Sequence, residues 1–276
     1  IYLLLGQYEK AKPLLEDALD LHRKHSPSGD LDLARNLHEL GRLLRHQGKM
    51  EKPARLFKES LRIQRNHFDE EHADIAKNLD ELAIIAARKG EIARADSLFR
   101  KALEMQKSIY GNNHPEVATG LHLLGLLHVM KDELSTAENL LRQSLTIREN
   151  HVDADNPAHA ETLDRLGQVL IRQGKVAEAE PMVREAMEIR KKLFPEQHPS
   201  RAVSLNNMGR LMRQKGNYEE AEQMFLDAGK IYKELYGPGN LDLANSILER
   251  ARVHKMKGDL RYAEDLYKRG MKIHKY

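Results

Sequence analysis

Apolar side chains recur along this chain at intervals of three and four residues, with polar turns between the stretches. This spacing puts the apolar residues on one face of an α-helix. One stretch predicts a helix over about Glu116–Met130, and a second predicts a helix over about Leu134–Asn150, with a turn at Lys131–Asp132 between them. The apolar positions are Val117, Leu121, Leu124 and Leu127 in the first helix, and Leu134, Ala137, Leu141 and Leu145 in the second.

The same helix pair returns every 42 residues without an insertion or deletion. The turn between the two helices holds a glycine in most copies, which suits the left-handed backbone that ends a helix; these glycines are Gly6, Gly48, Gly90, Gly174, Gly216 and Gly258. A fixed period of this length predicts an all-α solenoid of stacked antiparallel helix pairs. The expected units of this single solenoid domain are a partial leading repeat at 1–27, which holds the end of one first helix and a second helix, and repeats at 28–69, 70–111, 112–153, 154–195, 196–237 and 238–276.

Each first helix is preceded by a residue suited to capping. Pro115 stands at the first helical position, where its missing N–H has no cost, so His114 falls at the N-cap. At the same position of the other repeats the residue is Asp, Asn or His, and Asp and Asn are good caps. The expected caps are Asp30, His72, His114, Asn156, His198 and Asn240.

Small residues mark two interior positions where the helices of a pair come close. The first position holds Gly41, Ala83, Gly125, Gly167, Gly209 and Ala251, and the second holds Ala95, Ala137, Ala179, Ala221 and Ala263, with Pro53 as the exception. The pattern of Leu166-Gly167, Ala179, Val183 and Ala186 resembles the tetratricopeptide repeat (TPR). The 42-residue length, the linker Tyr110–Pro115 and Ser204–Gly209 resemble the kinesin-light-chain and nephrocystin-3 type.

That resemblance implies a right-handed superhelix whose first helices line a concave groove. It also implies which sites of each first helix face the groove. These sites lie one, four and five residues after the small residue at the first position (Gly41 and its equivalents), and three and six residues before it. Ten of these thirty positions are Arg or Lys and three are acidic, and apolar side chains gather in the middle of the array. The candidate groove residues are Arg42, Arg45, Ile84, Arg88, His122, Leu126, Val129, Met130, Gln168, Ile171, Arg172, Asn206, Arg210, Arg213 and Arg252.

Arginine suits such a groove because its planar guanidinium binds carboxylates in a bidentate manner. The pattern therefore favours a short peptide whose acidic residues flank apolar anchors. Relatives of the kinesin-light-chain type hold the peptide backbone with paired asparagines, and here only Asn206-Asn207 keeps such a pair. We therefore expect backbone clamping mainly near Asn206, and solvated arginines without a ligand remain an alternative.

Composition excludes several other classes. The formal charge of +3 on 276 residues is too small to favour nucleic acid, and aromatic residues for base stacking are scarce. The absence of cysteine excludes thiol chemistry and argues against a disulfide-stapled secreted protein, and no apolar run is long enough for a membrane span. No phosphate loop, nucleophile elbow or zinc-like ligand set is present, so we expect no enzyme activity, small-molecule substrate, metal or cofactor.

The leading hypothesis is a cytoplasmic adaptor module that binds peptides or proteins. The residues leave a second hypothesis open, which is a regulatory or self-association array of a larger signalling protein. Ile1–Leu5 resembles the last turn of a helix that lacks its start, and the last expected helix, Leu260–Tyr276, carries apolar residues on an uncovered face. We therefore expect the chain to be a piece of a longer protein, with terminal helices that could self-associate.

Overall fold

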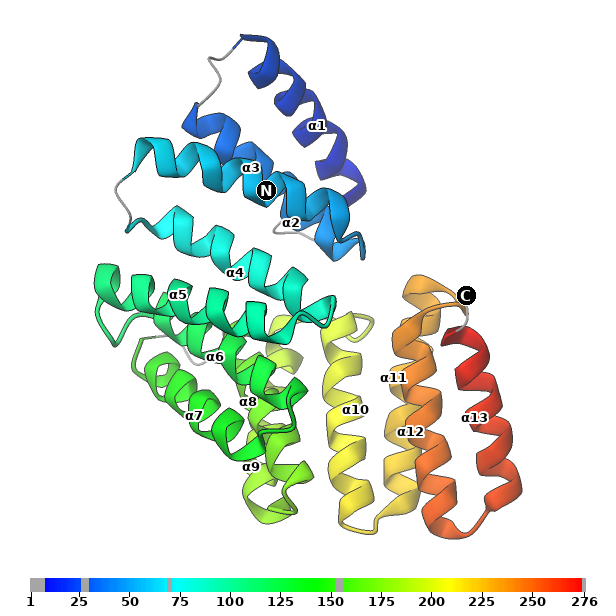
Figure 1. Cartoon of the computed structure of the whole chain (residues 1–276). Coiled ribbons are helices and arrows are strands. Elements are labelled where there is room, and N and C mark those ends of the chain that lie inside the picture. Colours follow the sequence, from blue (N-terminus) through cyan, green and yellow to red (C-terminus); the bar gives the residue numbers. More distant parts are fainter. Residues whose placement is uncertain (1–7, 26–29, 69–70, 152–155, 275–276) are drawn as a thin grey trace. The chain divides into compact units, whose positions relative to one another are not determined.

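The computed structural model describes residues 8–25, 30–68, 71–151 and 156–274, and in this part of the chain it contains thirteen helices and no strand (Figure 1). Their contacts divide the chain into two units, residues 1–131 and 132–276, so the division falls within the expected repeat 112–153. Ile1–Leu5, Gly6 and Tyr276 lie outside the described residues.

Unit 1 contains α1 to α6 and unit 2 contains α7 to α13. The helices of unit 1 are α1 (Tyr8–His25), α2 (Leu31–His46), α3 (Glu51–His67), α4 (Ala73–Arg88), α5 (Ile92–Tyr110) and α6 (Pro115–Met130). Those of unit 2 are α7 (Leu134–His151), α8 (Pro157–Arg172), α9 (Val176–Leu193), α10 (Pro199–Gln214), α11 (Tyr218–Tyr236), α12 (Leu241–Lys257) and α13 (Leu260–His274).

Within each unit, every helix packs against the next one along the chain, and some first helices of neighbouring repeats also touch (Figure 1). In unit 1, α4 contacts α6; in unit 2, α10 contacts both α8 and α12. The even-numbered helices are thus the first helices of the repeats. The structure confirms the predicted helices at α6, α7 and α13, with bounds that differ by no more than one or two residues over the described chain.

The predicted caps and turns are confirmed as well. All six expected cap side chains accept a hydrogen bond from the backbone N–H two residues on, including the three histidines through Nδ1. Each capping histidine also stacks on the aromatic ring four residues earlier, as His198 does on Phe194 with 4.1 Å between ring centroids. The turn glycines of the described repeats have φ between 77° and 89°, and Asp132, which replaces one of them, has φ 61°.

The small residues lie where the helices of a pair meet. A Cβ on Gly41 would stand 2.7 Å from the Phe57 ring, one on Gly209 would stand 2.8 Å from the Phe225 ring, and one on Gly167 would stand 2.7 Å from Val183. These distances are too short for a methyl group, so the approach of the helices requires glycine at these sites.

Buried polar side chains join consecutive repeats. In unit 1, Asn78 donates to Ser60 Oγ at 2.9 Å and to Gln64 Oε1 at 2.7 Å, and its own Oδ1 lies 2.9 Å from His38 Nδ1. In unit 2, Arg190 pairs with Asp164 and donates to Ser204 Oγ at 3.0 Å. The joint around Asn78 satisfies polar groups that would otherwise be costly to bury, whereas Oδ1 of Asp164 in the second joint has no hydrogen-bond partner.

Candidate functional site

The first helices of unit 1 surround a hollow with a volume of about 500 Å³. Its walls come from α2, α4 and α6 together with Gln64 and Phe68. Of the candidate residues, Arg42 and Ile84 line it. Its ionisable lining residues are Arg35, His38, Glu39, Arg42, Asp74, Lys77, Asp80, Glu81 and Glu116. The hollow thus contains more carboxyl groups than Arg and Lys side chains, which the sequence prediction did not anticipate.

Two candidate arginines of unit 1 are paired within the protein. Glu81, on α4, lies 2.6 Å from Arg45 Nε and 3.6 Å from Arg42 Nε, both on α2. Arg42 also lies 3.4 Å from Glu39. Arg45 and Glu81 are buried, and their ion pair links consecutive repeats.

A positive region nevertheless persists at the end of α2. Burial, together with the charges of Arg45, Arg42 and Arg88, lowers the pKa of His46 to about 4. Burial and the charge of Arg45 lower the pKa of Arg88 as well. Arg88 makes no ion pair with any residue that the structure describes. Glu81 therefore compensates only part of the positive charge here, and a ligand carboxylate would be stabilised.

The apolar candidates differ in exposure. Met130 is 56 % exposed, Leu126, Val129 and Ile84 are half-buried, and Ile171 is only 6 % exposed. Ile171 thus belongs to the core, because the site four residues after the small residue faces the neighbouring repeat. Arg45 at the equivalent site is buried for the same reason. His122 is also buried, so it offers little surface to a ligand.

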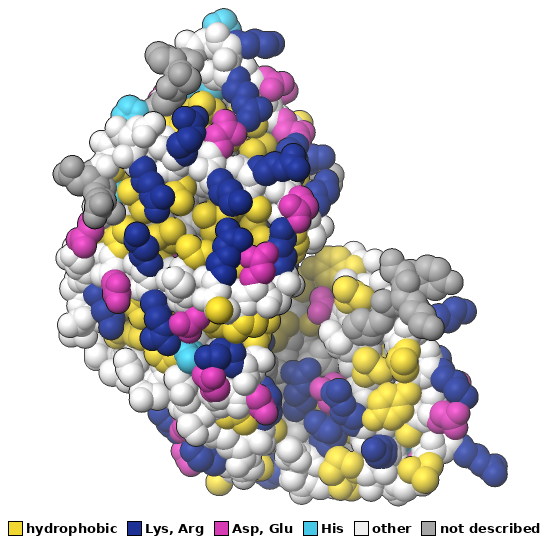
Figure 2. Space-filling view, viewed as in Figure 1, with side chains coloured by type: hydrophobic (Ala, Val, Ile, Leu, Met, Phe, Trp, Pro, Cys, Tyr) yellow, Lys and Arg dark blue, Asp and Glu magenta, His cyan; other side chains and the backbone are white. Residues whose placement is uncertain are grey.

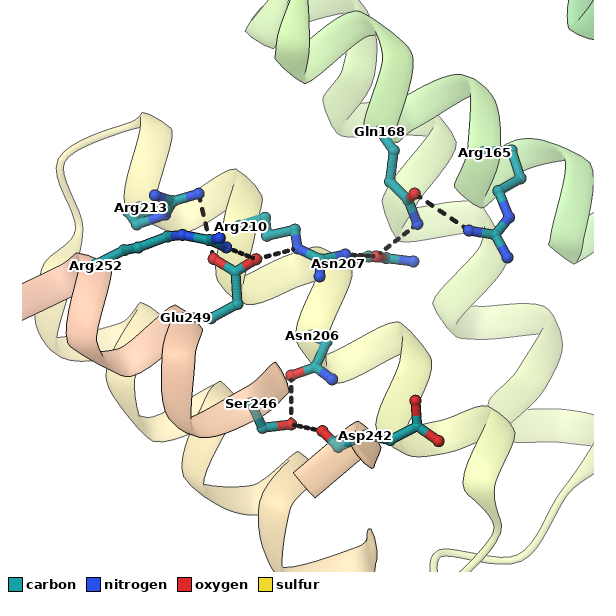
Figure 3. Close-up of polar contacts among 10 residues, drawn as sticks. All are labelled: Arg165, Gln168, Asn206, Asn207, Arg210, Arg213, Asp242, Ser246, Glu249 and Arg252. Atoms are coloured by element: carbon teal, nitrogen blue, oxygen red, sulfur yellow. Dashed lines mark hydrogen bonds and ion pairs between the residues drawn. The ribbon is translucent and has the colours of Figure 1, made fainter. Parts of the chain in front are cut away.

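In unit 2, three arginines converge on one carboxylate (Figure 3). Glu249, on α12, lies 2.8 Å from Arg210 Nε, 3.4 Å from Arg213 Nη2 and 2.8 Å from Arg252 Nη1. Burial opposes ionisation of Glu249, but the charges of the three arginines outweigh it and hold its pKa below the usual value. The cluster carries three positive charges against one negative charge, which leaves capacity for an anionic ligand.

Amide side chains extend this cluster towards α8 (Figure 3). Asn207 Oδ1 accepts from Arg210 Nη1 at 3.1 Å and from Gln168 Nε2 at 2.9 Å, and Gln168 Oε1 accepts from Arg165 at 3.4 Å. Asn206 Oδ1 accepts from Ser246 Oγ at 3.2 Å, while its amide nitrogen donates to no residue that the structure describes. Asn206 thus has a donor available for a peptide carbonyl.

Basic and acidic side chains are interspersed on the face shown in Figure 2, rather than gathered in one cationic field. The count of charges made from the sequence omitted one position of the first helices, two residues before the small residue (Gly41 and its equivalents). This position holds Glu39, Glu81 and Glu249. These carboxylates partner the arginines of their own or the preceding repeat. The remaining candidate, Arg172, lies 2.6 Å from Asp132 at the turn before α7.

The described residues include no helix long and apolar enough to cross a membrane. Nor does this part of the chain bring three His, Asp or Glu side chains together in a group that could hold a metal ion.

Helix pairs with recurrent caps, glycine turns and small contact residues define a helical repeat protein of the TPR class. The chain belongs to the tetratricopeptide repeat family, which matches residues 1–66, 71–150 and 158–234. Repeats of this family form protein–protein interaction scaffolds. No curated protein matches the sequence.

Several solved structures share the fold. Nearly identical TPR-like repeats of a kinesin light chain from Podosopora anserina are 22 % identical with a TM-score of 0.58, over 75 % of this chain and 98 % of that one. BtubC (BKLC) from P. vanneervenii is 21 % identical with a TM-score of 0.61, over 88 % and 89 %. The Rap conjugation gene regulator of the plasmid pLS20, in complex with the Phr* peptide, is 17 % identical with a TM-score of 0.77, over 99 % and 71 %.

Proposed function

We propose that this chain is a peptide-binding scaffold module that has no catalytic activity of its own. The first helices of the repeats form the binding surface, and the ligand is a short linear segment with acidic residues near apolar anchors. The observation that carries this proposal is the cluster of Arg210, Arg213 and Arg252 around the single carboxylate of Glu249.

Three arginines on two adjacent first helices provide several N–H donors in a partly buried setting. A peptide carboxylate that approaches them gains charge-assisted hydrogen bonds, which are stronger than neutral ones. The amide nitrogen of Asn206 would hold the peptide backbone nearby. In unit 1, Met130 and the half-buried Leu126 would contact apolar side chains, since exposed apolar groups on a repeat surface commonly mark a partner site.

Fold similarity supports the proposal without specifying the ligand. One structural neighbour, the Rap regulator of pLS20, was solved in complex with a peptide.

The test is a peptide array screened with the isolated chain, followed by affinity measurements on the best acidic peptide. Arg210→Ala combined with Arg213→Ala should weaken binding about tenfold or more, because one charged hydrogen bond contributes about 1.5 kcal/mol. The salt dependence of binding should fall as well, since fewer screened charges take part.

Arg184→Ala is the matched control, because Arg184 pairs with Glu180 on its own helix α9, outside the cluster. This control should bind like the unmodified chain. If the double variant folds normally and keeps its affinity for every acidic peptide, the assignment of the groove in unit 2 is wrong.

A second candidate function is self-association through the terminal helices. The α1 residues Leu14 and Leu21 are 56 % and 59 % exposed, and on α13 Tyr262 and Met271 are also exposed. Light scattering over a range of protein concentrations separates the two functions. A mass that rises with concentration would favour self-association, and a constant monomer mass would favour the peptide-binding module.

A further inference from the structure

The hollow of unit 1 contains a carboxyl group that lacks a full set of partners. Asp80, on α4, lines the hollow and is only 7 % exposed. Its Oδ2 accepts a hydrogen bond of 2.8 Å from Gln106 Nε2, whereas its Oδ1 has no hydrogen-bond partner. A buried carboxylate with one neutral donor is poorly stabilised in its charged form.

The surroundings of Asp80 are electronegative. Burial raises its pKa to about 8, and the charges of Glu81 and Glu116 raise it while the Gln106 hydrogen bond lowers it. The basic residues of the hollow do not compensate for this. Arg35 pairs with Asp32 at 2.9 Å, and Arg42 pairs with Glu39 and Glu81. Lys77 is exposed and makes no ion pair with any residue that the structure describes.

Unit 2 contains the same carboxyl group with its cation in place. Asp164 stands 84 residues after Asp80, at the equivalent repeat position, and is similarly buried. The residue equivalent to Gln106 is Arg190, which pairs with Asp164 and also donates to Ser204. In unit 2 the fold thus supplies an internal guanidinium, and in unit 1 the equivalent position holds a neutral amide.

We infer that the hollow of unit 1 binds a basic side chain of the peptide ligand, lysine or arginine, with its cationic group paired to Asp80. The inference rests on the proposed peptide-binding function and gives unit 1, taken by itself, a requirement for a positive charge in its ligand. Gln106 already occupies Oδ2 of Asp80, the atom at which Arg190 contacts Asp164, so the ligand ammonium or guanidinium pairs with Asp80 Oδ1. Glu81 and Glu116, which oppose ionisation of Asp80 in the free protein, also attract the cation.

Binding of a cation requires Asp80 to be ionised, so binding releases a proton. With a pKa of about 8, roughly a tenth of Asp80 is ionised at pH 7 and roughly nine tenths at pH 9. A lysine side chain remains almost fully charged over this range. The affinity of a basic peptide should therefore rise about tenfold between pH 7 and pH 9.

Other groups near Asp80 have to be separated from its titration. The ionisable and polar groups that line the hollow or touch Asp80 are Arg35, His38, Glu39 and Arg42 on α2, Gln64 on α3, Asp74, Lys77 and Glu81 on α4, Gln106 on α5, and Glu116 and Thr119 on α6. Asp80→Asn removes only the titration of Asp80 and leaves all of these groups in place. Any rise in affinity that persists in this variant belongs to another group.

The experiment is selection from a random peptide library by the intact chain and by Asp80→Asn, followed by affinity measurements on a selected peptide. The peptide is synthesised with lysine and with acetyl-lysine, which keeps the lysine chain but is neutral and longer by an acetyl group. The unmodified chain should prefer the lysine form, with a preference that grows about tenfold from pH 7 to pH 9. Asp80→Asn should bind both forms alike at both pH values.

Gln106→Arg is an independent variant, because it copies the pairing of unit 2 and should occupy Asp80 from within. It should abolish the lysine preference while the chain remains folded, and Asp265→Asn, an exposed change on α13, should leave the preference intact. Peptides bound without a basic preference, or a preference unchanged in both variants, would overturn this inference and leave the proposed function standing. Selection of no peptide at all would refute the proposed function and this inference with it.

Discussion

The histidine cap of α10, His198, makes the stability of unit 2 depend on pH. Its Nδ1 accepts a hydrogen bond of 3.1 Å from the N–H of Ser200, which requires a neutral ring with the proton on Nε2. Burial against Phe194 and the start of α10 lowers its pKa. A protonated ring would lose the acceptor and place a positive charge at a helix N-terminus, where the helix dipole is unfavourable to it.

The direction of the effect follows from the lowered pKa. Above pH 6.5 the ring is neutral in both the folded and the unfolded chain, and the cap contributes fully. As the pH falls below 6.5, the unfolded chain takes up a proton before the folded chain does, so stability decreases until the folded-state pKa is passed. The loss of an N-cap costs about 1 kcal/mol, or about 2–4 °C in melting temperature for a domain of the size of unit 2.

The assay is thermal and urea unfolding of the chain between pH 8 and pH 5, compared with His198→Asn. Asparagine is the cap at Asn156 and Asn240, where Oδ1 accepts from the backbone at 2.8 Å. His198→Asn should lose less stability on acidification than the unmodified chain by about 1 kcal/mol, because its cap does not titrate. His198→Ala should be less stable already at pH 8. Equal pH dependence in the unmodified chain and His198→Asn would refute this reasoning.

Two further changes test packing and the buried charge. Gly209→Ala places a methyl group 2.8 Å from the buried Phe225 ring and should destabilise unit 2 by about 1–3 kcal/mol in urea unfolding. The control is Gly229→Ala, which should cost clearly less because its new methyl group would stand 3.4 Å from the nearest neighbouring atom. Glu81→Gln leaves the buried Arg45 without its carboxylate and should lower the unfolding free energy by about 3 kcal/mol; a loss below 1 kcal/mol would show that water solvates Arg45 instead.

Repetition made the local structure of this chain predictable. Each cap, each glycine turn and each small contact residue occurs several times at the same position of the repeat. The role of an unusual residue, such as His114 at a cap, can therefore be inferred from the residues at the same position of the other repeats. The positive φ of Asp132 was predictable for the same reason. Short-range backbone rules act within a few residues, and the sequence contains all the information that they need.

The site was less predictable because it depends on contacts between repeats. Arg45 and Glu81 are 36 residues apart, and their pairing follows only from the placing of α2 and α4 in consecutive repeats. The burial of Ile171 likewise depends on its neighbouring repeat. The missing hydrogen-bond partner of Asp80 could not be predicted either, because it depends on the contact between Asp80 and Gln106 in neighbouring helices. The groove residues themselves stay a prediction that binding experiments have to test.

The buried joint around Asn78 has a consequence for how such an array can evolve or be re-engineered. Removal of residues 70–111 would preserve the period, the caps and the turns, and would bring Gly120 to the place of Asn78. Ser60 and Gln64 would then face a residue with no side chain to hydrogen-bond. The repeats of this chain are thus not interchangeable parts, because each one fits the particular neighbour that precedes it.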